Sequence, residues 1–361
     1  MRKIFPILLS VVIMSCELSA CAPVRPIREL RIVETMGCDL AEGGAALSIA
    51  AAKPQLRLTQ EAASLRLAMD RLRDQAASGA LFFAHTRYLL IGRAMAETDL
   101  APALDLMARS ADMRLRTPVF LLTNADAAEA VQTGDEERDV TKLLAALEAD
   151  YAQQGGGAVF SCAETLAALA ERGAALAAAC ALEENTLRPS GYGILKDGRC
   201  VGRIAPPQAQ GVNLLCGLGG HGDVRLGDAT VTLSACKTEI QPRWNEDTLA
   251  GLKITLRLRA ALTETDGRRD DTAEVARARL EAALARTVRG WCEGILRQSQ
   301  ALGADFLDLA GHIRRDNPSK WSRIAPEWSA ILPELPWTVT VEATLDRTLD
   351  LEAPVPLGGT E

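Results

Sequence analysis

Two cysteines near the amino terminus carry the clearest chemistry in the sequence. Cys21 closes a segment that fits a bacterial lipobox, in which a branched apolar residue and two small residues precede the cysteine. Those three residues are Leu18, Ser19 and Ala20. The thiol of a lipobox cysteine receives a diacylglyceryl group, and a signal peptidase then cuts in front of it. Cys16 fits less well, because Met14 occupies the middle position before it. We therefore predict lipid attachment at Cys21 and peptidase recognition at the three residues before it.

The segment ahead of Cys21 has the pattern of an export signal. Arg2 and Lys3 form a basic start, and residues 4–14 are almost purely apolar. A membrane-spanning helix needs about 20 apolar residues, so this run is too short to span. Two or three acyl chains hold a protein far more firmly than a single chain does. The mature protein is thus predicted to be anchored to a membrane through lipid without crossing it.

Other candidate sites in the sequence are weaker. Gly217, Gly219 and Gly222 have the GxGxxG spacing of dinucleotide-binding loops. That fold needs a helix directly after the glycines, whereas the chain here reads as extended. His85 precedes an apolar strand and is predicted to be structural, and His221 lies in a loop without a carboxylate to orient it. The sequence also contains no GxSxG or HExxH motif. We predict no enzyme, no cofactor and no metal site.

Seven further cysteines are scattered along the chain without a CxxC pair, which argues against zinc. Export permits disulfides. Most of these cysteines stand among apolar residues, however, and this favours buried free thiols over disulfides. The seven are Cys38, Cys162, Cys180, Cys200, Cys216, Cys236 and Cys292.

The elements that position these residues alternate between strands and helices in the first half of the chain. Residues 25–54 read as a strand, a turn and a second strand, and the next helix takes Thr59 as its N-cap and stops near Gly79. Residues 142–151 and 163–182 are also predicted to be helical. A strand, a helix and a strand are expected at residues 87–92, 99–112 and 116–123. This alternation is typical of an α/β domain.

The second half of the chain begins with a hairpin, whose turn residues Asp197 and Gly198 favour type I′. Alternating strands follow, and Asp271 is predicted to cap a long helix. The last strand, residues 337–345, is expected in the same sheet as residues 252–263, with the long helix across one face.

The long helix carries one apolar stripe at spacings of three and four, which we predict to be core. The stripe consists of Leu280, Leu284, Val288, Trp291 and Ile295. Gly290 and Gly294 lie beside it. A glycine inside a helix costs about 1 kcal/mol relative to alanine, so we expect these two to permit close approach of the helix to the sheet.

Composition bounds the fold and the partners. The chain has 361 residues, 48% of them apolar, which is enough for a large core. Its net charge of −7, without a basic block, argues against a nucleic-acid partner. We predict a multi-domain mixed α/β protein in which helices pack on mixed sheets and the long helix crosses a C-terminal antiparallel sheet. The expected parts are a signal peptide at 1–20, an α/β domain at 21–186, and an α/β domain at 187–361 that could divide near residue 245.

These segments, taken in order, resemble the Ger(x)C lipoproteins, the C subunits of bacterial spore germinant receptors. The lipobox, the first strand and the stretch that begins before His85 resemble the family's N-terminal half, and the hairpin and the late tryptophans resemble its C-terminal half. The matching positions are Cys21, Gly37, Asp39, His85, Pro318, Trp321 and Trp328. Leu349 departs from the pattern, because the family usually has a glycine there.

The resemblance implies a membrane-tethered, non-enzymatic subunit. It would act in nutrient-triggered germination on the outer face of the spore inner membrane, beside a multi-spanning A subunit and a permease-like B subunit. The competing interpretation is a solute-binding lipoprotein of a membrane transporter, with its ligand in a cleft between the two halves. An envelope hydrolase would need a nucleophile and a base that the sequence does not offer. Neighbouring genes would separate these classes, since a transporter comes with an ATPase gene.

Overall fold

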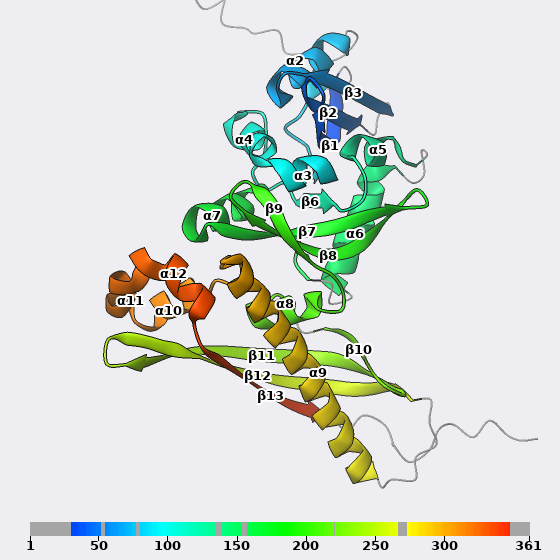
Figure 1. The fold of residues 1–361 in the computed structure, drawn as a ribbon. Helices are drawn as coiled ribbons and strands as arrows, with labels where there is room; N and C mark the ends of the chain where they lie inside the picture. Colours follow the sequence, from blue (N-terminus) through cyan, green and yellow to red (C-terminus); the bar gives the residue numbers. More distant parts are fainter. Residues whose placement is uncertain are drawn as a thin grey trace, which may run out of the picture.

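The chain folds into two β-sheets, each packed with helices (Figure 1). This computed structural model describes residues 30–51, 55–76, 80–134, 139–153, 157–219, 221–265 and 273–346. The first sheet has nine strands and the second has four, and both mix parallel and antiparallel pairs. The mixed α/β class predicted from the sequence is therefore confirmed.

The first sheet occupies the N-terminal part of the chain. Its strands are β1 (Leu30–Ala41), β2 (Gly44–Ala51), β3 (Leu56–Ala62), β4 (Ala80–Phe82), β5 (Tyr88–Ile91), β6 (Val119–Leu122), β7 (Ala174–Glu183), β8 (Thr186–Lys196) and β9 (Arg199–Ile204). The strand order is β3-β2-β1-β5-β6-β7-β8-β9, and the short β4 pairs with the start of β1. Strands β1, β5, β6 and β7 are parallel to one another, and the strands beyond them on both sides are antiparallel.

Helices cover both faces of this sheet, and its central strands are accordingly apolar along their whole length. Leu89 and Leu90 of β5 are neighbours that point to opposite faces, yet both are fully buried. Burial on both sides is what parallel strands between two helical layers require. One face carries α2 (Leu65–Gln75), α3 (Arg93–Thr98), α4 (Ala101–Arg109) and α7 (Cys162–Arg172), and the other carries α5 (Ala127–Gln132) and α6 (Val140–Gln153).

Two local predictions in this half are wrong. The helix predicted over residues 163–182 is in fact α7 followed by the strand β7, with Gly173 between them at a φ of 68°. Alanine-rich residues would propagate a helix in isolation, but pairing of β7 with both β6 and β8 in the buried sheet overrides this preference. The N-cap of α2 is Ser64, whose side chain accepts from the Leu67 backbone N–H at 3.3 Å, whereas Thr59 lies in β3. Gly79 lies outside the described residues.

The hairpin of β8 and β9 extends the first sheet beyond the domain boundary predicted between residues 186 and 187. Asp197 and Gly198 have φ values of 50° and 75°, which confirms the type I′ turn. Because β8 pairs with almost the whole of β7, the sheet continues to Ile204. The predicted boundary therefore lies inside a sheet, and the second sheet begins only at Gly222.

The second sheet has the order β10-β11-β12-β13 and is crossed on one face by the 30-residue helix α9 (Figure 1). Its strands are β10 (Gly222–Leu226), β11 (Ala229–Asn245), β12 (Thr248–Thr265) and β13 (Trp337–Leu345), and α9 is Ala273–Leu302. The last strand shares this sheet, as predicted, but it runs parallel to β12, so the sheet is mixed rather than antiparallel. The crossover through α9 explains this direction. Residue 245 ends β11 inside one hairpin and is not a point of division in the sheet.

The apolar stripe of α9 is core, with one correction. Leu284 and Val288 are fully buried, and Leu280 and Ile295 nearly so. Trp291 is only half-buried and packs beside Gly211 of α8 (Ala209–Cys216), while Cys292 takes the buried position. An α-helix has 3.6 residues per turn, so residues 291 and 292 both lie near the apolar stripe. Trp291 contacts α8 and stays half-buried, whereas Cys292 is fully buried.

The helix glycines do not have the predicted role. Gly290 and Gly294 are exposed, and a Cβ added to either would meet nothing within 4 Å. Close approach to the sheet therefore does not explain them. The predicted N-cap Asp271 lies outside the described residues.

The two sheets share one hydrophobic cluster. Ile194 and Ile204 of the first sheet belong to the same cluster as Leu256 of the second sheet and Leu284 of α9. Short helices fill one end of this cluster. They are α10 (Leu309–Asp316), α11 (Pro318–Ile324), the 3₁₀ turn η2 (Ala325–Glu327) and α12 (Trp328–Glu334).

Candidate functional site

The predicted lipid-attachment site lies outside the described residues. Cys21 and its recognition residues Leu18, Ser19 and Ala20 precede Leu30, where the described chain begins as β1. Leu349 likewise falls beyond the described part. Within that part, no helix is long and apolar enough to cross a membrane. Lipid attachment at Cys21 thus remains a prediction from the sequence.

Gly37 and Asp39, which match the family pattern, form a structural device at the carboxyl end of β1. Asp39 is buried, and its two carboxylate oxygens accept from the backbone N–H groups of Ala127 at 2.7 Å and Ala128 at 2.8 Å. These donors open helix α5, so Asp39 caps that helix. A Cβ at Gly37 would lie 2.9 Å from the Ala127 Cβ, which shows that glycine is needed for α5 to come this close. Burial raises the pKa of Asp39 to about 6, although the two backbone hydrogen bonds oppose the rise.

This cap has a consequence for ligand binding. In open α/β sheets, ligands usually bind beyond the carboxyl ends of the parallel strands, often with an anionic group on a helix N-terminus. Here the protein's own carboxylate fills that position at α5. The arrangement therefore fixes the helix to the strand rather than opening a site.

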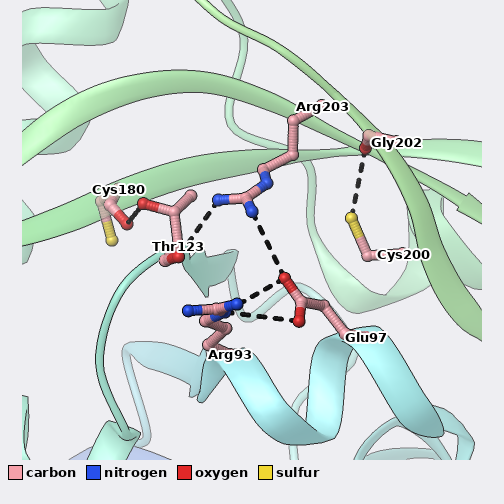
Figure 2. A network of polar contacts seen from close by, with 7 residues as sticks. All are labelled: Arg93, Glu97, Thr123, Cys180, Cys200, Gly202 and Arg203. Carbon is pink, nitrogen blue, oxygen red and sulfur yellow. Dashed lines mark hydrogen bonds and ion pairs between the residues drawn. The ribbon is translucent and has the colours of Figure 1, made fainter.

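A polar network lies beside the same edge of the sheet, and Figure 2 shows Arg203 of β9 at its centre. The Arg203 guanidinium pairs with Glu97 of α3 at 3.3 Å and donates to the Thr123 carbonyl at 3.1 Å. Glu97 also pairs with Arg93 at 3.2 Å, one helical turn earlier. The Arg203 carbonyl accepts from Gln298 of α9 at 3.1 Å. The network joins α3, β6, β9 and α9, which makes it a structural link between the two halves.

His85 lies at the opposite, amino-terminal edge of the parallel strands. Its ring packs against the Phe82 ring at a tilt of 45°, with centroids 5.4 Å apart, and His85 is exposed at the rim of a cleft of about 490 Å³. Around this cleft stand Arg87 before β5 and Arg114 and Arg116 before β6. We call it the arginine cleft; its further polar lining is Glu34, Thr86, Tyr88, Thr117 and Glu148.

The sequence reasoning missed this cleft. It singled out His85 but none of the three arginines, because Arg87 lies more than 25 positions before Arg114 and Arg116 and belongs to a different loop. One signal was available, because residues directly before parallel strands gather at one edge of a sheet. The Arg-Leu-Arg run at residues 114–116, directly before a predicted strand, therefore pointed to this edge.

The late tryptophans build a second buried cap. Asp305 is buried and accepts from the backbone N–H groups of Leu309 and Ala310, both at 2.8 Å, at the start of α10. The Trp328 Nε1–H donates to the same carboxylate at 3.2 Å. Trp321 packs edge-on against Trp328, with ring centroids 5.4 Å apart, and Pro318 is the first residue of α11. These matched positions thus hold the terminal helices together, and burial raises the pKa of Asp305.

The remaining candidates make no reactive site in the described part of the chain. Gly217 and Gly219 follow the end of α8, and Gly222 is the first residue of the strand β10, so no helix follows the glycines, as predicted. His221 is exposed. The seven cysteines in the described residues are free thiols, four of them buried, and burial raises the pKa of Cys162, Cys180 and Cys292 to about 12. Thiols of this kind are protonated and unreactive at neutral pH. Among the described residues, no three His, Cys, Asp or Glu side chains gather to hold a metal.

The fold and these sites define a two-sheet α/β protein whose matched residues serve packing and capping. Comparison with known families assigns it further. The profile described as "Spore germination protein N-terminal domain" matches residues 23–177, and the profile described as "Spore germination B3/ GerAC like, C-terminal" matches residues 190–349. The chain therefore belongs to the Ger(x)C family of spore germination proteins.

A solved structure agrees on the fold. The chain is similar to the crystal structure of the GerBC protein, with a TM-score of 0.58 and 15% identity over 86% of this chain and 96% of that one. None of the curated proteins compared matches significantly. The break between the two family profiles, at residues 178–189, lies within β7 and β8 and so falls inside the first sheet.

Proposed function

We propose that this protein is a lipid-anchored, non-enzymatic subunit of a spore nutrient germinant receptor. It is attached through Cys21 to the outer face of the spore inner membrane and supports assembly with the integral-membrane A and B subunits. The observation that carries the proposal is the order of two spore germination profiles over nearly the whole mature chain. The lipobox at residues 18–21 supports the anchor.

A tether gives this role a physical basis. Confining a domain to the membrane surface raises its effective concentration near membrane partners, so modest interfaces suffice for assembly. The buried caps at Asp39 and Asp305 support a scaffold role, because these buried carboxylates bind helix N-termini of the protein itself. The raised pKa of the buried thiols supports a non-enzymatic role, because a protonated thiol is unreactive at neutral pH.

The alternative, a solute-binding lipoprotein, predicts a ligand cleft between the two halves. In the described part of the chain, side chains of both sheets and of α9 form one hydrophobic cluster at this place. Leu302 of α9 also accepts through its carbonyl from Lys196 of β8 at 2.9 Å. These contacts favour a fixed junction over a cleft that opens and closes.

The test compares spores that carry the wild type, Cys21→Ala, Cys16→Ala and a deletion. We expect the deletion to abolish the response to at least one nutrient, while non-nutrient agents still trigger germination. Cys21→Ala should weaken the same response and lower the amount of the partner subunits, and the matched Cys16→Ala should do neither. Mass spectrometry of the N-terminal peptide should find acylated Cys21. Normal nutrient germination in the deletion, with no redundant receptor present, would refute the assignment.

A further inference from the structure

The arginine cleft is a surface feature that the proposed function leaves unused. Arg87, Arg114 and Arg116 are all exposed at its rim. In the described part of the chain, no carboxylate forms an ion pair with Arg114 or Arg116. Arginine presents a planar fork of donors that matches phosphate oxygens in pairs. The rim is therefore suited to a phosphate group.

The acidic residues of the cleft are less exposed than the arginines. Glu34 and Glu148 are half-buried, and Glu148 accepts from the buried Tyr88 hydroxyl at 2.7 Å. Burial, followed by the neighbouring Glu148, raises the pKa of Tyr88 to about 12, so this hydroxyl keeps its proton. The Arg87 guanidinium lies 5.5 Å from the Tyr88 ring centroid, which holds it in a cation–π contact. The three exposed arginines thus outnumber the two half-buried carboxylates of the cleft.

Two exposed apolar side chains flank these charges. Ile32 of β1 is 36% exposed and lines the cleft, and Leu115, between the two arginines, is 40% exposed. Surfaces that bind anionic membranes combine large apolar side chains with arginines. The apolar groups enter the headgroup boundary, and the cations contact phosphate.

The position of the cleft relates it to the membrane. It lies at the amino-terminal edge of β1, β5 and β6, and β1 begins at Leu30, nine positions after Cys21. Nine extended residues span at most about 30 Å, so the anchor keeps this edge of the sheet near the bilayer.

We propose that the arginine cleft docks on the membrane surface by binding the phosphate headgroups of anionic lipids through Arg87, Arg114 and Arg116. The inference rests on the proposed lipid anchor, which brings the cleft to the bilayer. Docking would add a second point of attachment and so fix the orientation of the first sheet relative to the bilayer. A single attachment point would leave this orientation free.

The test uses the unlipidated chain from residue 22, which contains every described residue, and vesicles of phosphatidylglycerol mixed with phosphatidylcholine. Each basic residue near an anionic membrane strengthens binding by about fivefold, so the triple variant Arg87→Gln, Arg114→Gln, Arg116→Gln should bind about a hundredfold more weakly. The matched control is Arg188→Gln, Arg243→Gln, Arg286→Gln, at exposed arginines elsewhere, and it should bind like the wild type. High ionic strength should weaken wild-type binding.

Several outcomes would overturn the proposal. These are equal binding to pure phosphatidylcholine vesicles, equal loss in the control variant, and failure of the wild type to bind anionic vesicles. The last result would point to an acidic segment of a partner protein. Binding of inorganic phosphate without any vesicle binding would assign the cleft to a soluble phosphate. The vesicle assay needs neither acylation nor receptor partners. A negative result with vesicles therefore does not refute the proposed receptor function, and a negative result with spores does not refute lipid binding by the arginine cleft.

Discussion

The first sheet is covered on both faces, whereas the second is covered on one. All four residues of β5 are buried, as are all four of β6. In β13, by contrast, only Val341 and Leu345 are buried, and Glu342 and Thr344 between them are exposed. The outer face of the second sheet carries ion pairs instead of helices, such as Arg259 with Asp346 at 2.7 Å. Such exposed pairs contribute little to stability, typically under about 1 kcal/mol.

The difference shows where each half can tolerate change. A strand between two helical layers has no position at which a substitution leaves stability unchanged, whereas a strand with one solvent-exposed face has such a position at every second residue. The outer face of the second sheet is therefore free to vary for partner contact. In the first sheet the central strands β5 and β6 have no such position, and the arginine cleft lies at the amino-terminal ends of these strands.

Leucine substitutions at neighbouring positions give the largest expected effect and could break this comparison. Leu89→Ala and Leu90→Ala in β5 should each lower the free energy of unfolding by about 2–5 kcal/mol, because both side chains are fully buried. In β12, Leu256→Ala should cost as much, but its exposed neighbour Arg257→Ala should cost under about 1 kcal/mol. Urea unfolding measures all four. A large cost at Arg257 would mean that a second layer covers the outer face.

The two buried aspartates give the next effect, because the same device appears in both halves. Asp39→Ala and Asp305→Ala each leave one buried and one partly buried backbone N–H group without its acceptor, at about 1–3 kcal/mol for the buried group and less for the other. Asp305→Ala should cost more, since it also releases the Trp328 indole N–H. The exposed Asp228→Ala is the control and should change the unfolding free energy by less than about 0.5 kcal/mol. Equal, small effects at all three positions would contradict the capping role.

The titration of Asp39 sharpens the comparison further. Its pKa is raised by burial from 3.8 to about 6 in the folded protein, so between these values the folded state binds more protons than the unfolded state. Stability from this group is therefore present below about pH 4 and is lost as the pH rises through about 6. The loss should amount to roughly 2–3 kcal/mol. Asp39→Asn, which cannot ionise, should cost less at about pH 7.5 than at about pH 4.5 by this difference. Unfolding curves at both pH values measure it, and a cost that rises with pH would contradict the shift.

Prediction of helices and strands from the sequence succeeded for elements with one solvent-exposed face. The long helix and the alternating strands of the second sheet show a period that a single sequence displays, so their existence and pairing were predicted. The direction of β13 was not, because alternation carries no information about strand direction. In the first sheet, burial on both faces removes the period. The short apolar runs of β5 and β6 were still predicted as strands, but the alanine-rich β7 was predicted as helix.

The candidate site was predicted less completely. Gly37, Asp39 and the late tryptophans were identified through resemblance, but their capping geometry depends on N–H groups more than 80 positions away in the case of Asp39. Asp305 was not singled out, since an aspartate that caps from four residues upstream has no signature distinct from a surface aspartate. The arginine cleft depends on how two loops meet, which local patterns do not encode.

Glycines give the smallest expected effect, and its sign differs between the halves. Gly290 and Gly294 sit inside α9 with open space where a side chain would start, so Gly290→Ala and Gly294→Ala should each stabilise the protein by up to about 1 kcal/mol. Gly92, after β5 in the first sheet, is the contrasting position, because a Cβ there would overlap the Asp39 carboxylate that caps α5. Gly92→Ala should therefore destabilise. Thermal and urea unfolding of the three variants decide the matter. If alanine at 290 or 294 destabilised the isolated protein, α9 would pack more tightly than its open flank indicates. If alanine there raised stability but impaired germination, this flank of α9 would be a contact for a partner subunit, which would extend the comparison from the two sheets to the receptor.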